Sequence, residues 1–383
     1  MSTEPKAPLI ADARTLRRPL NLREASYEDY AQIAALESKY GLEAKVFDEW
    51  KHLWFNNPAY KEHQGSMPIG WVLEAANQKI VGYLGNIPLH YEVEGRRLLA
   101  SVAHAWVVET DYRPYSVLLL ERYFSQKIVD LFLNATVGPR AADAFAAFQS
   151  VPVPVGDWDR SLFWITNYQH FLMGWLAMKA FPLAKPLSYL LSFGIFLKDA
   201  FTQRRLGPQN EVELERCTEV DARFDIFWEA LRKINSHRLM AVRSREVLEW
   251  HFKYALLQNK AWIVTATKGS DLAAYAIFHR HDNLRYGLRR IRLVDYQTLD
   301  GNTAYLGSML SWALERCKGE GVDMLESIGF CAHKRNVIEQ FAPHQRRLPS
   351  WLYFYKTGDQ HLAEKLNEPG VWDPSQYDGD ASF

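Results

Sequence analysis

One carboxylate interrupts an apolar run that is otherwise typical of a buried strand. Asp295 lies in Arg292-Leu293-Val294-Asp295-Tyr296. Burying a charged carboxylate is costly unless it is paired, and buried titratable groups gather at functional sites. Asp295 is therefore a candidate catalytic residue. The alternative is a plain ion pair with one of the neighbouring arginines, Arg289, Arg290 or Arg292.

A thiol and an imidazole stand two residues apart in Cys331-Ala332-His333, just after an expected strand from Met324 to Gly329. A nucleophilic cysteine can be built from such a pair. The sequence offers no third group to orient the histidine, so the pattern is incomplete. The three cysteines, Cys217, Cys317 and Cys331, lack metal-ligand spacing, which predicts reduced thiols and no metal site.

The elements that must position these residues follow from apolar periodicity and turn signals. In the first half we expect a strand at 20–25, helices at 27–40 and 46–55, and antiparallel strands at 70–75, 79–91 and 98–109. A helix opened by Pro114, a strand at 131–137 and a helix at 141–149 follow. In the second half we expect a strand at 211–217, helices at 219–235 and 245–255, and strands at 260–267, 271–280 and 288–298. A helix at 303–318, a strand at 322–328, a helix at 333–342 and a strand at 350–356 complete it.

Pieces of the first half recur in the same order roughly 190 residues downstream, which is the pattern of an internal repeat. The strand beginning at Leu22 matches the one at Leu214, and the helix of Trp50 matches that of Trp250. Ile80–Tyr83 matches Leu272–Tyr275, and Trp106-Val107-Val108 matches Leu293-Val294-Asp295. The sequence therefore predicts two copies of one α/β unit.

The order strand, two helices, three antiparallel strands, helix, strand, helix, strand resembles the GNAT acyltransferase superfamily. The resemblance implies an α/β (α+β) protein with two GNAT-like domains, each a mixed, mostly antiparallel sheet flanked by helices. We expect a flexible N-terminal arm (1–19), a donor-binding domain (20–155), an aromatic helical connector (156–207) and a second domain (208–360). A polar, loop-like tail (361–383) would follow.

In that superfamily the third antiparallel strand splays from the next strand and receives the acyl-pantetheine arm of coenzyme A. The following helix binds the pyrophosphate through the signature R-x-x-G-x-G/A. Here Arg113-Pro114-Tyr115-Ser116-Val117-Leu118 keeps the arginine and places Ser116 and Leu118 at the glycine positions. A helix N-terminus attracts anions through its unpaired N–H groups and dipole.

The resemblance therefore implies that acyl-coenzyme A, such as acetyl-coenzyme A, meets Arg113, Tyr115 and Ser116. The alternative is a turn in which Pro114 starts a buried helix and Arg113 is solvated. The matching segment of the second half, Leu299 to Tyr305, has no arginine and no glycine pair. We expect that half not to bind the nucleotide.

Acyl transfer to an amine needs a proton acceptor and donors for the thioester oxygen. The resemblance places both on the splayed strand, with His104 or Glu109 as the base and the backbone of Val107 and Val108 at the thioester. Five residues apart on a strand, His104 and Glu109 point to opposite faces unless a bulge intervenes. The structural alternatives are a core role for His104 and a solvated strand end for Glu109.

Two further positions follow from the resemblance. Asn134, on the strand facing the splayed one, is expected to bond the pantetheine arm or to cap a local turn. The superfamily's usual acid is a tyrosine on the next helix, and this chain has Phe145 and Phe148 there instead. Another group or water must then protonate the departing thiolate, or the first half is catalytically weak.

Ser161 to Met178 contains no charged residue and is rich in aromatic residues. Lys179, Pro182 and Lys185 interrupt the apolar run that continues to Leu197, which argues against a spanning helix. We interpret 161–197 as helices packed across two domains. A segment lying on a membrane surface, or the wall of a pocket for a long acyl chain, is the alternative.

Composition limits the partners. Lys plus Arg (45) equals Asp plus Glu (45), so no net field attracts nucleic acid, and DNA is not expected as a partner. The N-terminal residues lack the apolar core of a signal peptide, which predicts a cytoplasmic protein.

The sequence therefore predicts an N-acyltransferase that moves an acyl group from a coenzyme A or carrier-protein thioester to a small-molecule or peptide amine. One alternative is a scaffold that kept the fold and lost the chemistry. Another is a transferase of the peptidoglycan-bridge type that uses aminoacyl-tRNA. The neutral charge argues against that second alternative, because phosphate binding needs a basic surface.

Overall fold

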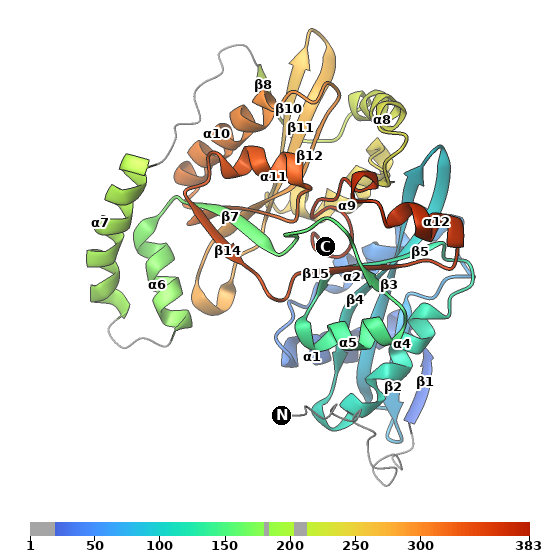
Figure 1. The fold of residues 1–383 in the computed structure, drawn as a ribbon. Helices are drawn as coiled ribbons and strands as arrows, with labels where there is room; N and C mark the ends of the chain where they lie inside the picture. Colours follow the sequence, from blue (N-terminus) through green and yellow to red (C-terminus); the bar gives the residue numbers. More distant parts are fainter. Residues whose placement is uncertain (1–19, 180–183, 203–212) are drawn as a thin grey trace, which may run out of the picture. The chain divides into compact units, whose positions relative to one another are not determined.

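The computed structural model describes residues 20–179, 184–202 and 213–383, so the expected N-terminal arm lies outside the described residues. The elements of the first half are shown in Figure 1. Its strands are β1 (Leu20–Glu24), β2 (Gly70–Ala75), β3 (Ile80–Val93), β4 (Arg96–Val108), β5 (Leu131–Val137) and β6 (Val151–Pro152). Its helices are α1 (Tyr30–Lys39), α2 (Phe47–Phe55), α3 (Pro58–Glu62), α4 (Ser116–Phe124) and α5 (Pro139–Ala147), with 3₁₀ turns η1 (Tyr27–Asp29) and η2 (Thr110–Tyr115).

The second half has a similar set of elements. Its strands are β7 (Arg160–Ile165), β8 (Leu214–Cys217), β9 (Met240–Ala241), β10 (Ala261–Lys268), β11 (Asp271–Arg280), β12 (Arg290–Thr298), β13 (Met324–Ile328), β14 (His344–Arg347) and β15 (Leu352–Lys356). Its helices are α6 (Tyr168–Met178), α7 (Ala184–Thr202), α8 (Arg223–Ile234), α9 (Arg245–Leu257), α10 (Ala304–Gly319), α11 (Ala332–Glu339) and α12 (Gln360–Leu366), with 3₁₀ turns η3 (Leu284–Tyr286) and η4 (Pro369–Val371).

The two sheets have matching strand orders. The first runs β1-β2-β3-β4-β5-β15-β6, with β9 paired to β3, and the second runs β8-β10-β11-β12-β13-β7-β14. Each is mostly antiparallel with one parallel pair, β4 with β5 and β12 with β13. The predicted mixed, mostly antiparallel sheets flanked by helices are thereby confirmed.

The sheets exchange one strand. β15 pairs with β5 and β6, and β7 pairs with β13 and β14. The expectation that the strand at 350–356 completes the second sheet is therefore wrong, and the first part of the expected helical connector is a strand, β7. Apolar alternation identifies a strand but does not identify its partner, so local pattern could not reveal this exchange.

Both parallel ladders are short. β4 pairs with β5 only over Ala100–Val102 with Leu131–Leu133, although β5 continues to Val137. β12 pairs with β13 over Arg290–Leu293 with Met324–Ser327, although β12 continues to Thr298. These are the positions at which the resemblance to GNAT proteins predicts that the strands splay.

The residues of α2 explain its packing. Trp50, Leu53 and Trp54 recur at helical spacing and are buried, so this helix presents one apolar face. Trp54 also donates its indole N–H to the carbonyl of Asn86 at 2.7 Å. Asn86 belongs to β3. This strand is buried at almost every position, as is typical of a central strand covered on both faces.

The chain divides into two compact units. Unit 1 comprises residues up to 55, 60–87 and 103–128, and unit 2 comprises 56–59, 88–102 and 129–383. Unit 1 therefore holds β1, β2 and the C-terminal part of β4. Unit 2 holds the whole second sheet, β5, β15 and the C-terminal tail.

The expected tail begins within α12, and from Asn367 on it is irregular apart from η4, but it is not a solvated loop. From Val371 to Gly379 every residue is buried, and Ala381 and Ser382 are buried as well. Polar composition misled the prediction here, because polar side chains of the tail such as Asp373, Ser375 and Asp378 form hydrogen bonds inside unit 2.

Candidate active site

In unit 1, β4 leads into α4 through η2, and this turn holds the expected phosphate-binding residues. Pro114 lies inside η2, so α4 begins at Ser116 and not at the proline. Arg113 is exposed and forms no ion pair with any described residue. Tyr115 and Ser116 are half-buried at the start of α4. The turn therefore presents an available cation beside a helix N-terminus.

Glu109 follows β4 directly, and its carboxylate bonds to the C-terminal end of α1 and to the residue before β3. Its carboxylate accepts hydrogen bonds from Lys39 Nζ at 2.5 Å, Lys79 Nζ at 3.0 Å and the Tyr40 hydroxyl at 3.3 Å. The hydrogen bond from Lys39 is the main cause that lowers the pKa of Glu109. A carboxylate held charged in this way is a weak proton acceptor, so these contacts favour a structural role.

β4 contains a residue in the left-handed region, Ala105, at φ 53°. A left-handed residue within a strand is typical of a β-bulge, which breaks the alternation of side chains. The burial pattern agrees, because Ala103–Trp106 are all half-buried and Val107 and Val108 are both buried. The rule that His104 and Glu109 must face opposite sides therefore does not hold here.

His104 and Tyr83 lie around a position without a side chain. A Cβ on Gly85 would lie 2.8 Å from the Tyr83 hydroxyl and 3.3 Å from His104 Cβ. The glycine therefore lets the Tyr83 hydroxyl and His104 approach the same stretch of backbone closely. Burial, with a smaller effect from Lys45, lowers the pKa of His104 to about 3, so the ring is neutral at pH 7.

Glu37 adds a carboxyl group to this cluster. It is 4% exposed on α1, and its Oε1 has no hydrogen-bond partner among the described residues. Burial raises the pKa of Glu37 to about 7, although Lys45 opposes the shift. Burial is the main cause of the raised pKa of Tyr83, and the charge of Glu37 is the second cause. The two groups therefore lie close enough to interact electrostatically.

Glu37, Tyr83 and His104 form what we call the polar cluster of unit 1. A carboxyl group with a pKa near 7 is suited to accept and return a proton at neutral pH. Sequence reasoning missed Glu37 and Tyr83. A signal existed, because Glu37 lies four residues after Ile33, on the apolar side of its helix.

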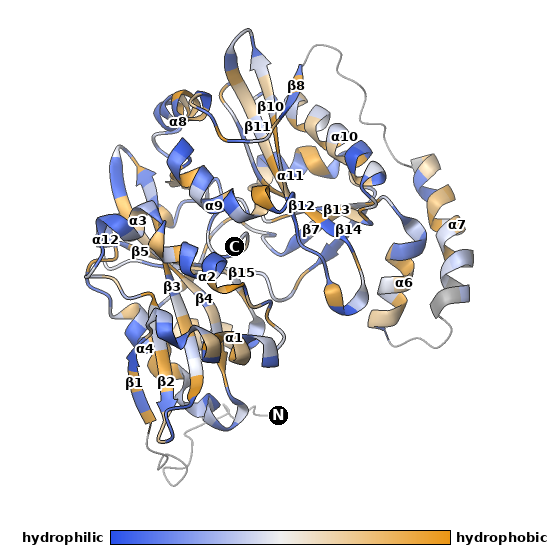
Figure 2. Cartoon of the chain, turned by 180° about the vertical axis from the view of Figure 1, so that it is seen from behind, coloured by the Kyte–Doolittle hydropathy of each residue, from blue (hydrophilic) through white to orange (hydrophobic). Residues whose placement is uncertain are grey.

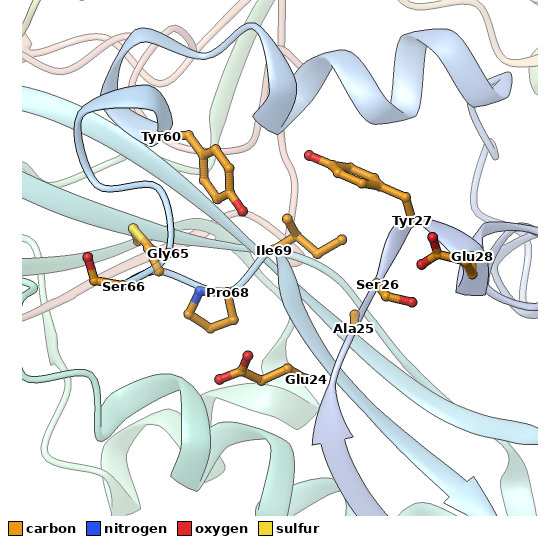
Figure 3. A pocket seen from close by; sticks show the side chains of 11 residues that line it. Glu24, Ala25, Ser26, Tyr27, Glu28, Tyr60, Gly65, Ser66, Pro68 and Ile69 are labelled. Atoms are coloured by element: carbon orange, nitrogen blue, oxygen red, sulfur yellow. The ribbon is translucent and has the colours of Figure 1, made fainter.

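A pocket of about 290 Å³ opens in unit 1 at the C-terminal end of β1. Figure 3 shows Glu24, Tyr27 and Tyr60 around it, with Pro68 and Ile69 as its floor. Tyr27 packs edge-on against Trp50 of α2, with the ring centroids 6.0 Å apart. A hollow with carboxylates and aromatic rings is suited to an ammonium group.

In unit 2, Asp295 is completely buried and fully bonded. Arg243 binds it in bidentate fashion, at 2.8 Å from Nε and 3.1 Å from Nη2. The Tyr275 and Ser375 hydroxyls each donate to it at 2.9 Å. Burial opposes its charge, but Arg243 offsets this and lowers the pKa of Asp295. The ion pair expected with a neighbouring arginine is therefore made with Arg243, 52 residues away in sequence.

The C-terminal tail lies along the splayed part of β12. Tyr377 N–H donates to the carbonyl of Val294 at 3.2 Å, and Val294 is the extra residue of a bulge opposite β11. Gln376 Nε2 reaches the carbonyls of Leu293 on β12 and Ile328 on β13. The chain itself thus bridges the two strands where the second ladder ends.

Cys331 has the third partner that the sequence did not reveal. Its thiol donates to Asp373 Oδ1 of the tail at 2.9 Å, and His333 Nδ1 lies 3.2 Å from the sulfur. Burial raises the pKa of Cys331 to about 12, so the thiol stays protonated. The charge of Asp373 adds to this shift, whereas Lys334, whose Nζ lies 2.9 Å from Asp373, opposes it. The Lys334 ammonium also disfavours a divalent metal ion at this carboxylate.

Asn134 belongs to unit 2, where it is buried on β5 opposite Phe354. Two residues further, Thr136 donates to Asp380 of the tail at 2.7 Å. Burial raises the pKa of Asp380 to about 6. His104, Val107, Val108, Glu109, Arg113, Tyr115 and Ser116 lie together in unit 1, whereas Asn134 and Asp295 are residues of unit 2.

Neither family models nor curated proteins match this sequence. Solved structures do match its fold. Saccharomyces cerevisiae N-myristoyltransferase with bound myristoyl-CoA aligns over 93% of this chain and 83% of its own, at 12% identity and a TM-score of 0.57. A GCN5-related N-acetyltransferase from Kribbella flavida aligns over 91% and 72%, at 10% identity and 0.53.

A third such structure, a GCN5-related N-acetyltransferase from Anabaena variabilis, aligns over 89% of this chain and 73% of its own, at 12% identity and a TM-score of 0.51. Identities this low bear on the fold alone. The chain has the two-domain GNAT fold of these proteins.

Proposed function

We propose that this protein transfers an acyl group from an acyl-coenzyme A thioester to an amine. The observation that carries the proposal is the bulged strand β4, which passes the polar cluster and ends at a turn with an exposed Arg113. The fold supports it, because its structural relatives are named as N-acetyltransferases and as an N-myristoyltransferase with bound myristoyl-CoA.

The donor is assigned to the first half. Arg113, Tyr115 and Ser116 would hold the phosphates, and the backbone N–H groups of Val107 and Val108 would bind the thioester oxygen. Asn134 would bond the pantetheine arm. The matching strand of the second half, β12, is bridged by the chain's own tail, so a donor there would have to displace it.

The proton from the acceptor goes to the polar cluster. Glu37, with a pKa near 7, would take the proton of the ammonium directly or through water, while neutral His104 accepts a hydrogen bond from the amine. The amine nitrogen then attacks the thioester carbonyl, the C–N bond forms and the C–S bond breaks. The thiolate leaves and takes a proton from Glu37 or from water, because Phe145 and Phe148 have none to give. The attacking nitrogen releases its second proton to water as the amide forms.

The pocket beside β1 would admit the acceptor. Glu24 and Glu28 supply negative charge and Tyr27 and Tyr60 supply ring faces, which favours a cationic small-molecule or peptide amine. The matching strand orders support the interpretation that the halves are copies of one unit. The second copy would serve a structural role.

Binding of the donor tests the proposal. We expect acetyl- or long-chain acyl-coenzyme A to raise the melting temperature, since a ligand that binds the folded state stabilises it. Arg113→Ala should weaken binding roughly tenfold, as measured by calorimetry, because it removes a charged phosphate contact. Arg122→Ala, an exposed arginine at the other end of α4, is the matched control. Equal affinities of the two variants would remove the donor site.

The alternatives are separated by the same assay. A protein that responds to none of the coenzyme A thioesters, and acylates no amine in their presence, is a scaffold or takes its acyl group from a carrier protein. Two features favour that reading, namely Leu118 at a glycine position and the phenylalanines at the usual tyrosine position.

A further inference from the structure

Two helices of unit 2, α6 and α7, form what we call the apolar hairpin. Among the described residues, eight of the nineteen exposed large apolar side chains lie on it. They are Trp175, Met178, Tyr189, Leu191, Phe193, Phe196, Leu197 and Phe201. Phe201 is 86% exposed and Phe193 is 64% exposed. Figure 2 shows orange residues along both helices. Contiguous exposed apolar surface of this kind marks an interaction site.

α7 is amphipathic, but its polar face is the buried one and its apolar face is exposed. Among the α7 residues whose side chains the structure describes, the buried ones are polar, Ser188 and Asp199, and Ser192 and Ile195 are half-buried at the positions between them. This face is fixed to the body of unit 2, because Asp199 accepts hydrogen bonds from the Tyr168 hydroxyl at 2.9 Å and His344 Nε2 at 2.8 Å. Because the polar face is bonded to unit 2, the apolar face of α7 points away from it.

α6 anchors the hairpin to the second sheet. Phe171 and Leu172 pack with Phe163 of β7, Leu288 and Met324 in one buried cluster. Trp175 and Met178 emerge from the same helix on its exposed side. The exposed surface is thus part of the folded unit and is held in place by its core.

The width of the exposed apolar arc of α7 indicates whether its partner is a protein or a lipid bilayer. At about 100° per residue, the exposed apolar residues of α7 cover roughly 220° of the helix, whereas the inward positions cover about 60°. A globular protein partner contacts one stripe of a helix, which is narrower than this. A fluid apolar medium covers the whole arc, as it does for helices that lie in a membrane interface.

The charges point to the same partner. Residues 161–202 contain three cations, Lys179, Lys185 and Lys198, and a single acidic residue, Asp199, which is buried. Lys179 and Lys198 are exposed. Lysines beside aromatic and aliphatic side chains are attracted to anionic headgroups, while their alkyl stems follow the apolar surface.

We propose that the apolar hairpin binds the surface of an anionic lipid bilayer and lies in its interface. None of the described helices is both long and apolar enough to cross a bilayer. The acyltransferase proposal is not needed for this inference.

Vesicle sedimentation tests it. The protein is spun with vesicles of phosphatidylcholine alone and with vesicles of equal parts phosphatidylcholine and phosphatidylglycerol. We expect it to pellet with the anionic vesicles, and the variant Phe193→Ser/Phe196→Ser/Phe201→Ser to partition more weakly by roughly tenfold or more. The matched control is Ile226→Ser/Ile234→Ser/Leu257→Ser, which changes three exposed side chains of α8 and α9. This control should bind as the parent does.

Charge and self-association are tested separately. Lys179→Glu/Lys198→Glu should weaken binding to the anionic vesicles, and added salt should weaken binding of the parent in the same way. Three results would overturn the inference: a parent protein that stays in the supernatant with anionic vesicles, a control that loses as much binding as the hairpin variant, or a parent dimer that the hairpin variant converts to monomer. The last result would identify a second copy of the chain as the partner. Circular dichroism confirms that each variant is folded.

Discussion

β4 and β12 occupy the same position in two sheets of the same strand order. They differ in whether the buried polar groups near their ends have hydrogen-bond partners. Both strands carry a bulge, at Ala105 and at Val294. Beside β12 the buried carboxylate is paired with Arg243, and the tail bridges the strands. Beside β4 a buried carboxyl group keeps an oxygen without a described partner, and Arg113 is exposed.

Two sheets of the same strand order thus use their buried polar groups differently. Buried polar groups that are fully bonded hold a structure together, while one left unsatisfied is either a cost or a function. In the second half the C-terminal tail supplies the missing partners, so that half is suited to stability. In the first half Glu37 Oε1 has no hydrogen-bond partner among the described residues.

The largest expected effect comes from breaking the pair in the second half. Arg243→Met leaves Asp295 and Asp378 buried without their cation and should reduce the free energy of unfolding by about 3–5 kcal/mol. Urea denaturation measures the loss, and hydrogen exchange should locate it at β12 and the tail. Arg245→Met, which removes an exposed pair with Glu249, should cost less than about 1 kcal/mol. Equal losses would show that the buried pair is not special.

The next effect sharpens the assignment of chemistry to the first half. Glu37→Gln should lower kcat by about 100-fold or more, since it removes the proton acceptor and keeps the shape. The parent's rate should rise with pH through an apparent pKa near 7, and the variant should lack this rise. Glu109→Gln is the comparison variant at a carboxylate held by lysines. If it abolishes the pH dependence and Glu37→Gln does not, the base is Glu109.

The same glutamate predicts a pH dependence of stability. Its pKa in the folded state, about 7, lies above its ordinary value of 4.5, so the folded state binds the proton more tightly. Stability is therefore greatest below pH 4.5 with respect to this group and falls as pH rises to about 7. Glu37→Gln should be more stable than the parent at pH 8 by about 3 kcal/mol, and the advantage should vanish near pH 4. Thermal unfolding at the two pH values measures both differences.

The smallest effect concerns the cysteine of the second half. Cys331→Ala removes a protonated thiol that donates to Asp373, which keeps its bond to Lys334. We expect the free energy of unfolding to change by about 1 kcal/mol and the rate of acyl transfer to stay unchanged. A large loss of activity with normal stability would give Cys331 a catalytic role and would place chemistry in the second half.

The local sequence pattern by itself determined much of the secondary structure of this protein. Apolar periodicity predicted most strands of both sheets and the helices beside them, because it depends on neighbouring residues. It did not predict β6, β7, β9 or β14. The matches of Trp50 with Trp250 and of β3 with β11 follow from the sequence in the same way. So does the position of Arg113 between β4 and α4, since a strand, a turn and an apolar stripe follow one another there.

Tertiary structure decided the rest, because it depends on which distant segments meet. The exchange of β7 and β15, the burial of the polar tail and the pairing of Asp295 with Arg243 join residues far apart in sequence. The inverse amphipathicity of α7 is visible only when its polar face is seen to bond the body of unit 2. The importance of Glu37 likewise comes from the burial that α1 acquires on packing, which raises its pKa to the range where a proton can move.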